Sequence, residues 1–262
     1  MHRYLVAGSA GLALSACALV SAAAAQQSAP IVQAVTKALA DPRRPAADVV
    51  RDGARHPAEL IAFAGVKPGD RVADYFAGGG YFTRILSDVV GPKGRVYAII
   101  PAEMARNCDP SEFAGARKVA AEGTYRNVAV LTRPAAGFAP AKPLDAIWSS
   151  QNYHDLYDGF MEGLDVAAAD KTLFAALKPG GVLLVVDHVA EAGSGVRDTE
   201  TRHRIDPARI KSDLEAAGFV FEDESSALRN PADDHALRVF DPKVRGRTDQ
   251  VVLKFRRPKP DC

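Results

Sequence analysis

The chain has 262 residues, of which 47% are hydrophobic and 25% are charged. These values are ordinary for a globular protein, and they exclude a disordered chain, a coiled coil and a polytopic membrane protein. Lysine and arginine together number 33 against 32 aspartates and glutamates, which gives a formal net charge of +1. Because a dedicated nucleic-acid binder needs a basic surplus, we expect no nucleic-acid partner. The length suits one large α/β domain or two small ones.

The first 25 residues have the composition of a secretory signal peptide. They contain Arg3 and no acidic residue, and a run of small residues ends at Ala25. A second pattern, residues 14–17, resembles a bacterial lipobox in which Cys17 would carry a lipid anchor. Because the apolar run continues past Cys17, we favour cleavage near Ala25, and we expect an exported, periplasmic protein without a membrane span. The alternative is a buried helix of a cytoplasmic protein, which the lack of an amphipathic period disfavours.

Residues 26–64 are predicted to form a helical lead-in, or lid, ahead of the core domain. The residues that interrupt its helical pattern are Pro42, Pro45, Gly53 and Pro57. A turn over residues 65–70 then opens a Rossmann-like core domain, which we expect to run from residue 65 to residue 257. Residues 258–262 are a tail.

Strand and helix patterns alternate through the core domain. We expect strands at residues 71–75, 95–100, 128–132, 144–149, 182–186, 219–224 and 250–255. Helices are expected at residues 81–90, 110–122, 165–177 and 207–217, with a turn at 178–181. The alternation predicts a doubly wound α/β fold, with a seven-stranded sheet that is mostly parallel and has an antiparallel last strand. In such sheets, ligands bind beyond the carboxyl ends of the strands.

The most informative stretch follows the first of these strands. Asp74 ends the strand, and Gly78, Gly79 and Gly80 lead into a helix. Glycine permits a positive φ and lets a ligand lie against the backbone, while the start of the helix offers free N–H groups. The spacing G-x-G-x-x-G is absent, which disfavours a nicotinamide-dependent oxidoreductase. A tight turn without a ligand is the alternative, but three adjacent glycines exceed what such a turn needs.

This stretch resembles motif I of the class I S-adenosylmethionine-dependent methyltransferases. Asp74, Gly78 and Gly80 match the motif, whereas Phe76 stands where its first glycine would be. Residues 65–70 and 177–181 also resemble that family, and the resemblance covers residues 46–255. It implies S-adenosylmethionine as the cofactor, held by Asp74, Phe76, Gly78, Gly79, Gly80 and Glu103. Residues 55–59, 150–156 and 230–235 resemble a narrower branch of predicted methyltransferases whose members carry a leader peptide.

The sequence departs from the family at two cofactor contacts. The family usually has an acid at the end of the second strand, where it holds the ribose hydroxyls, and Ile100 stands there in this chain. Glu103, one turn later, is the candidate replacement. After the third strand the family usually has an aspartate near the adenine amino group, and residues 132–135 supply none.

The candidate catalytic residues follow the fourth strand. Asn152 would orient an acceptor through its amide, and the ring of Tyr153 would lie against the sulfonium as a cation–π contact. His154 is the candidate general base because an ordinary imidazole titrates near neutrality. The alternative for His154 is a structural histidine that holds the loop. His188, at the end of the fifth strand, is the second candidate base.

Other polar groups receive simpler interpretations. Nothing fixes the geometry of Asp233, Asp234 and His235, so a solvated loop is favoured there and no metal site is predicted. The basic residues Arg51, Arg55 and His56 of the lead-in would meet an anionic acceptor or form a solvated helix face.

Two functions remain in view. The first is a methyltransferase that moves a methyl group from S-adenosylmethionine to a small molecule. The second is a non-catalytic binding protein that keeps the fold. The missing ribose and adenine acids favour the second, and so does a leader that takes the chain away from the cytoplasm, where the methyl donor is made.

Overall fold

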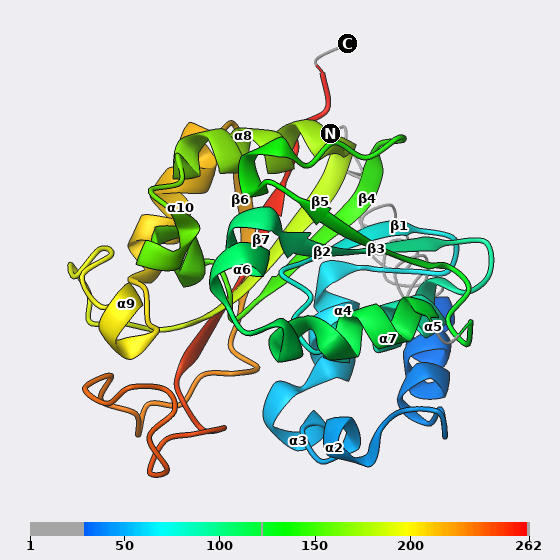
Figure 1. Ribbon diagram of the computed structural model, residues 1–262, viewed down its shortest axis with the longest axis horizontal. Coiled ribbons are helices and arrows are strands. Elements are labelled where there is room, and N and C mark those ends of the chain that lie inside the picture. Colours follow the sequence, from blue (N-terminus) through cyan, green and yellow to red (C-terminus); the bar gives the residue numbers. More distant parts are fainter. Residues whose placement is uncertain (1–28, 122, 261–262) are drawn as a thin grey trace, which may run out of the picture.

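The core of the protein is a twisted sheet, whose strands are labelled β1 to β7 in Figure 1. The computed structural model describes residues 29–121 and 123–260. Within them, seven strands pair in the order β3-β2-β1-β4-β5-β7-β6. All neighbours are parallel except β7, which runs antiparallel to both β5 and β6. The strands are β1 Arg71–Tyr75, β2 Arg95–Pro101, β3 Val128–Arg133, β4 Leu144–Ser150, β5 Leu177–His188, β6 Val220–Ser225 and β7 Gln250–Arg256. The predicted sheet is thereby confirmed.

Helices cover both faces of the sheet and bury two separate apolar cores. One core receives side chains from α4 (Pro57–Ala64), α5 (Tyr81–Val90), α7 (Ala114–Ala121) and the helical residues 29–39. The other receives side chains from α6 (Ala102–Asn107), α8 (Val166–Ala176) and α10 (Pro207–Ala216). The central strands therefore lie between two layers, which explains why Val182–Val186 reads as a continuous apolar run.

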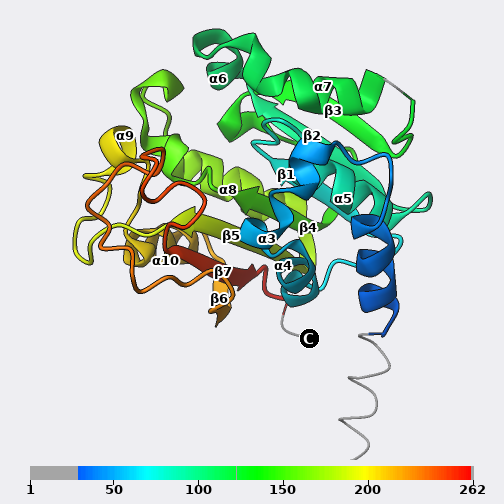
Figure 2. The ribbon, with the colours of Figure 1, turned by 90° about the horizontal axis from the view of Figure 1, so that it is seen from below.

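The N-terminal helices are shorter than the pattern over residues 46–64 suggested. They are α2 (Ala46–Val49), α3 (Asp52–Arg55) and α4, and Figure 2 labels α3 and α4 beside the sheet. Gly53 lies within α3, so the prediction of a break there was wrong. The chain bends instead at residues 50–51 and at His56, whose φ is 42°. These bends turn α3 toward the carboxyl ends of the strands.

Residues 178–181 belong to β5, although they were predicted to form a turn. The register between β4 and β5 shifts between Leu144 and Ala146, and Gly180 has a φ of +79°. Glycine and proline are common both in bulges of this kind and in turns. The sequence pattern therefore did not distinguish a bulge within β5 from a turn before it.

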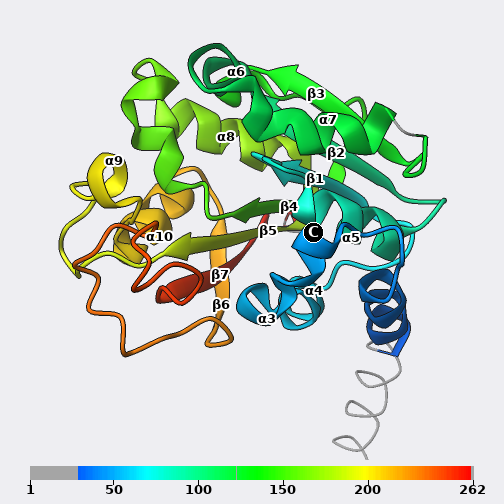
Figure 3. The same cartoon turned by 60° about the horizontal axis from the view of Figure 1, so that its bottom comes forward.

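Four short 3₁₀ helices complete the described elements and lie in the connections. They are η1 Pro110–Phe113, η2 Ala135–Gly137, η3 His154–Tyr157 and η4 Gly159–Met161. The single-turn helix α9 (Thr199–Arg202) lies beside residues 226–249, the long connection between β6 and β7 (Figure 3). No helix among residues 29–121 and 123–260 is both long and apolar enough to cross a membrane. The predicted signal peptide at 1–25, with Cys17, and the end of the tail lie outside the described residues.

Candidate active site

A cavity of about 900 Å³ opens at the carboxyl ends of the parallel strands. Phe76 and Gly78 reach it from the end of β1, Met104 and Cys108 follow β2, and His188 ends β5. Other lining residues are Arg51, Gln151, Asn152, His154, Asp155, Asp158, His203 and Arg238. A smaller cavity of about 170 Å³ shares Arg51, Phe76, Gly78 and Asn152 with it. This edge of the sheet is where doubly wound folds bind their ligands.

The glycine loop between β1 and α5 forms part of both cavities. Gly78 has a φ of +49°, and a Cβ added there would meet nothing nearer than the carbonyl oxygen of Phe76 at 4.0 Å. A Cβ on Gly79 would meet no atom within 4 Å. Gly80 differs, because a Cβ there would come within 3.1 Å of the Ala116 Cα in α7. Gly78 and Gly79 thus leave open space, whereas Gly80 allows the loop to pack against a helix.

Phe76 forms a wall of the cavity. It has a φ of 60°, and its buried ring packs edge-to-face on Tyr75 with 4.8 Å between the ring centres. The ring belongs to the core between the sheet and α6, α8 and α10, so the space beside Gly78 remains open. The residue that replaces the first glycine of the family motif therefore does not close the site.

A buried acid and a buried cation face the smaller cavity. The Asp74 carboxylate accepts a hydrogen bond from the Thr83 hydroxyl at 2.5 Å, and burial raises the pKa of Asp74 to about 6. Burial also lowers the pKa of Arg55 to about 10, with a further contribution from Arg51. Arg55 donates to the side chain of Gln151 and lies 5.0 Å from the centre of the Tyr81 ring. Within the described chain no carboxylate forms an ion pair with Arg55.

His154 lies at the other end of the large cavity, between two carboxylates. Its Nδ1 is 2.7 Å from Asp187 Oδ1, and its backbone N–H donates to Asp187 Oδ2 at 2.8 Å. Its Nε2 is 3.1 Å from Asp155 Oδ1. Burial alone would lower the pKa of His154, but Asp187 and Asp155 outweigh it and hold the pKa well above its ordinary value. The two carboxylates therefore favour the protonated ring, and the role of His154 as a general base stays a prediction.

A second histidine completes this cluster from a distant segment. His203, at the end of α9, places Nδ1 3.3 Å from His154 Nε2. Arg238, in residues 226–249, donates to His203 Nε2 at 2.9 Å. A fully buried ion pair between Arg204 and Asp233, with Nη–Oδ distances of 2.9 and 3.1 Å, anchors this connection. The favoured solvated position of Asp233 was therefore wrong, because its partner lies 29 residues away in the sequence.

Two predicted residues lie away from the cavity. The Tyr153 ring is buried in the core, and its hydroxyl donates to Asp170 Oδ2 at 2.9 Å. The prediction that this ring faces the sulfonium was wrong, because an aromatic ring beside a core strand gains more by burial. Glu103 does not line the cavity, and its carboxylate accepts from the Ala135 N–H at 3.1 Å. Its role at the ribose stays a prediction that this contact does not support.

The remaining candidates lie at the cavity. Asn152 lines both cavities, as an acceptor-orienting residue would. His188 lines the large one, and its Nδ1 is 2.8 Å from Thr248 Oγ1. Burial lowers the pKa of His188 to about 3, so its ring is neutral. Asp155, His203 and Arg238 were not predicted, and the only signal for them in the sequence was that Asp155 adjoins His154.

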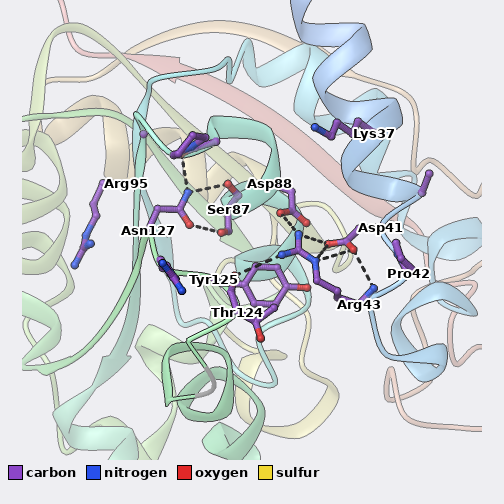
Figure 4. A pocket seen from close by; sticks show the side chains of 15 residues that line it. Lys37, Asp41, Pro42, Arg43, Ser87, Asp88, Arg95, Thr124, Tyr125 and Asn127 are labelled. Atoms are coloured by element: carbon purple, nitrogen blue, oxygen red, sulfur yellow. Dashed lines mark hydrogen bonds and ion pairs between the residues drawn. The ribbon is translucent and has the colours of Figure 1, made fainter.

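A second large cavity, of about 670 Å³, lies at the opposite edge of the sheet (Figure 4). Its lining residues precede β2 and β3, so they lie at the amino ends of the strands. Arg43 bridges Asp41 and Asp88, with distances of 2.6 and 2.7 Å, and Asn127 bonds to the Ser87 backbone. Asp88 Oδ2 and the Tyr125 hydroxyl have no hydrogen-bond partner among the described residues, and we assign this cavity no chemistry.

Comparison with known sequences gives one distant relationship. No protein-family model matches the chain. It is 31% identical over 136 residues to a protein-L-isoaspartate O-methyltransferase of Ignicoccus hospitalis, a match that covers 49% of this chain and 52% of the relative. The chain thus spans about half the length of that curated relative.

Comparison with solved structures identifies the fold. A SAM-dependent methyltransferase from Aquifex aeolicus superposes with a TM-score of 0.57 at 19% identity, over 86% of this chain and 97% of that one. A methyltransferase from Mesorhizobium loti gives 0.55 at 19% identity, over 79% and 100%. A [4+2]-cyclase gives 0.56 at 20% identity, over 84% of each chain. The chain therefore has the fold of the class I S-adenosylmethionine-dependent methyltransferases.

Proposed function

We propose that the protein is an S-adenosylmethionine-dependent methyltransferase that acts on a small-molecule acceptor. The observation that carries this proposal is a single cavity of about 900 Å³ that joins the glycine loop at Gly78 to the buried cluster around His154. The fold and the distant methyltransferase relative support the same interpretation.

The residues around the glycine loop fit the amino-acid end of this cofactor. Gly78 and Gly79 leave open space against the backbone, as a ligand lying there requires. Arg55 supplies a buried positive charge suited to a carboxylate, and Asp74 supplies a buried acid suited to an ammonium group. The fit is weaker at the nucleoside end, where β2 ends in Ile100 and Pro101 and Glu103 is bonded to Ala135.

S-adenosylmethionine, when bound, supplies an electrophilic methyl group on a positively charged sulfur. The protein then has to hold the acceptor in line with that methyl and to exclude water. Asn152 lies between the two cavities, where its amide can orient an acceptor. His154 Nε2 faces the large cavity and can accept a proton from an acceptor above its raised pKa. Asp187 holds the ring in place through Nδ1.

Calorimetric titration with S-adenosylhomocysteine tests the proposal. We expect micromolar binding to the full chain and at least a tenfold loss in Gly78→Val, whose side chain would enter the cavity. The matched control is Gly65→Val, which has the same left-handed strain at a φ of +73° and ends α4 outside both cavities. No heat with the unmodified chain at millimolar ligand would contradict the proposal. Equal losses in both variants would show that strain, rather than occupancy, is responsible.

A small-molecule acceptor is favoured over a protein one. The distant relative is a protein-L-isoaspartate O-methyltransferase by name. Here the acceptor end of the cavity is enclosed by residues 226–249 and α9, and its volume lies within the range of about 300–1,000 Å³ that is usual for small ligands. Methyl transfer to an isoaspartyl peptide, measured with labelled cofactor, would contradict this choice.

A binding protein without catalysis is the second candidate. It is favoured by the weak fit at the nucleoside end, where Glu103 has a backbone partner. The superposition on a [4+2]-cyclase also shows that this fold is not confined to methyl transfer. Absence of S-adenosylhomocysteine binding, together with a different small molecule retained through purification, would favour this candidate.

We further propose that the chain is exported and belongs to the leader-bearing branch that its motifs resemble. The composition of residues 1–25 supports cleavage near Ala25 rather than lipidation of Cys17. Mass spectrometry of the mature protein tests this. We expect an N-terminus at Gln26. A lipidated N-terminal Cys17 or an intact Met1 would contradict the proposed cleavage.

A further inference from the structure

Three side chains in the large cavity place potential metal ligands together. His154 Nε2, Asp155 Oδ1 and His203 Nδ1 all lie within 4.8 Å of one another. The separations are 3.1 Å from His154 to Asp155, 3.3 Å from His154 to His203 and 3.9 Å from His203 to Asp155. Two ligands of one ion at bond lengths of about 2.1 Å lie about 3.0–3.4 Å apart at angles between 90° and tetrahedral. Two of the three separations already fall in that range.

His154 is held in the orientation that a metal ligand requires. Its Nδ1 bonds to Asp187 Oδ1 at 2.7 Å, and Asp187 also accepts the backbone N–H groups of His154 and His188. When the ring is neutral with its proton on Nδ1, the lone pair of Nε2 points toward Asp155 and His203. Because Asp187 and Asp155 favour the protonated ring, a metal ion has to displace the proton on Nε2. Metal-binding histidines almost always donate the other ring N–H to a carboxylate, a backbone carbonyl or a water, because this bond fixes the tautomer and strengthens the ligand.

Several buried carboxylates surround His154. Asp155, Asp158 and Asp187 are all buried around one imidazole. Asp158 lines the cavity, and its Oδ1 has no hydrogen-bond partner among the described residues. The Asp158 carboxylate also bonds to the Thr199 side chain, and a buried carboxylate oxygen left without a partner is costly. An unpaired, buried oxygen is thus a second sign, separate from the cluster itself, that a cation belongs here.

We propose that His154, Asp155 and His203 bind one divalent transition-metal ion, with open coordination positions facing the large cavity. Two imidazoles and one carboxylate suit Zn²⁺, Fe²⁺ or Co²⁺, and are too rich in nitrogen for Mg²⁺ or Ca²⁺. The open positions would take an oxygen of the molecule bound in the cavity. The metal site goes beyond the proposed methyl transfer and does not depend on it. When the ion is bound, His154 Nε2 is a ligand and no longer a proton acceptor.

One contact opposes metal binding. Arg238 donates to His203 Nε2 at 2.9 Å, which leaves the proton of a neutral ring on Nδ1. For Nδ1 to bind a metal, this proton must move to Nε2 and the Arg238 contact must break. Arg238 comes from the connection between β6 and β7, and its guanidinium also lies 5.0 Å from the centre of the exposed Phe240 ring. It therefore has an alternative position.

Titration of the chelator-treated full chain with Zn²⁺ alone tests the site. We expect one equivalent to bind with a Kd near or below about 1 μM. We also expect Co²⁺ to give the visible absorption of a site with nitrogen ligands. His203→Ala and Asp155→Asn should each weaken Zn²⁺ binding at least tenfold, and Asp187→Asn should weaken it by about tenfold through the lost orientation of His154. The matched control is His56→Asn, which removes a histidine that pairs with Glu59 outside the cavity.

The outcomes separate the metal site from the proposed function and from misfolding. Circular dichroism and S-adenosylhomocysteine titration of the same variants show whether the fold and the cofactor site survive. The absence of saturable Zn²⁺ binding in the full chain would overturn the proposal, whatever the cofactor titration gives. Equal Zn²⁺ affinity in the full chain, His203→Ala and Asp155→Asn would also overturn it.

Arg238→Met provides a test in which the variant is expected to bind Zn²⁺ more tightly, not less. Because this variant removes the donor that competes at His203 Nε2, we expect Zn²⁺ to bind several-fold more tightly. A simple loss of cavity structure would weaken binding instead. A weakened or unchanged affinity would contradict the assignment of His203 Nδ1 as a ligand.

Discussion

The two ends of the proposed ligand site differ in how they are built. At the ends of β4 and β5, His154, Asp155 and Asp187 form a buried, charged cluster. At the end of β2, the chain presents Ile100 and Pro101, and the nearby acid Glu103 is occupied by a backbone N–H. Buried charges seldom add net stability compared with apolar residues of the same volume. On the proposed function, the β4–β5 end would carry the chemistry, whereas the β2 end would hold the cofactor mainly by shape.

The largest effect is expected at the charged end. Asp187→Asn removes the negative charge that faces the His154 ring and one of three accepted hydrogen bonds, and we expect it to lower the free energy of unfolding by about 3 kcal/mol. Urea denaturation in the presence of a chelator measures it. Asp223→Asn, on the exposed face of β6, is the control and should change stability by less than about 0.5 kcal/mol. Equal changes in the two variants would mean that Asp187 contributes no more to stability than an exposed aspartate does.

The pH dependence of ligand affinity distinguishes the contribution of Asp74 from that of the nucleoside end. Burial raises the pKa of Asp74 from 3.8 to about 6, so the carboxyl becomes neutral as the pH falls below that value. Affinity for S-adenosylhomocysteine should then fall about tenfold per pH unit, while 5′-methylthioadenosine, which lacks the amino acid, should bind with constant affinity. The free energy of unfolding of the ligand-free protein changes with pH in the opposite direction. The contribution of the neutral Asp74 is complete below pH 3.8 and is lost as the pH rises through about 6.

Calorimetry over this pH range checks the Asp74 prediction. Asp74→Asn should abolish the pH dependence and leave the methylthioadenosine affinity unchanged. A parallel loss of both ligands at low pH would show that the acid acts through the fold instead.

Arg55→Met tests the same difference between the two ends, and we expect a smaller change in ligand affinity. Methionine keeps much of the packing over the Tyr81 ring but removes the buried positive charge. We expect affinity for S-adenosylhomocysteine to fall about tenfold, or about 1.4 kcal/mol, and affinity for 5′-methylthioadenosine to stay within threefold. If both ligands lose affinity equally, Arg55 is a structural residue.

The smallest effect is expected at the nucleoside end. The Glu103 carboxylate accepts from the Ala135 N–H, so Glu103→Gln should change affinity for S-adenosylhomocysteine by less than about threefold. A loss of tenfold or more would show that Glu103 leaves Ala135 and binds the ribose, which would revise the contrast between the two ends.

The local parts of this structure could be predicted from the sequence. Apolar runs mark the strands, and the glycines after Asp74 mark the turn into α5, because these signals depend only on neighbouring residues. The bulge in β5 was not predicted, since residues 178–181 carry turn chemistry within a strand. Tyr153 was misplaced because adjacency to His154 does not say which side of a 3₁₀ helix faces the core.

The charged cluster depends on contacts that no local pattern contains. Asp187 meets His154 only because β4 and β5 pair with Ser150 opposite Val186. His203 and Arg238 arrive from separate connections, 49 and 84 positions after His154, and Arg238 reaches the site because Asp233 is bonded to Arg204. The elements of the site could therefore be predicted, but its charge pairing could not.

A crystal structure of the full chain with S-adenosylhomocysteine tests the central claim most directly. We predict electron density for the ligand against Gly78 and Gly79, with its carboxylate beside Arg55 and its sulfur toward the cavity that contains His154. Density in the cavity that Arg43 and Asp88 line at the opposite edge of the sheet would contradict this, and so would a Phe76 ring that moves over Gly78 and leaves the ligand outside.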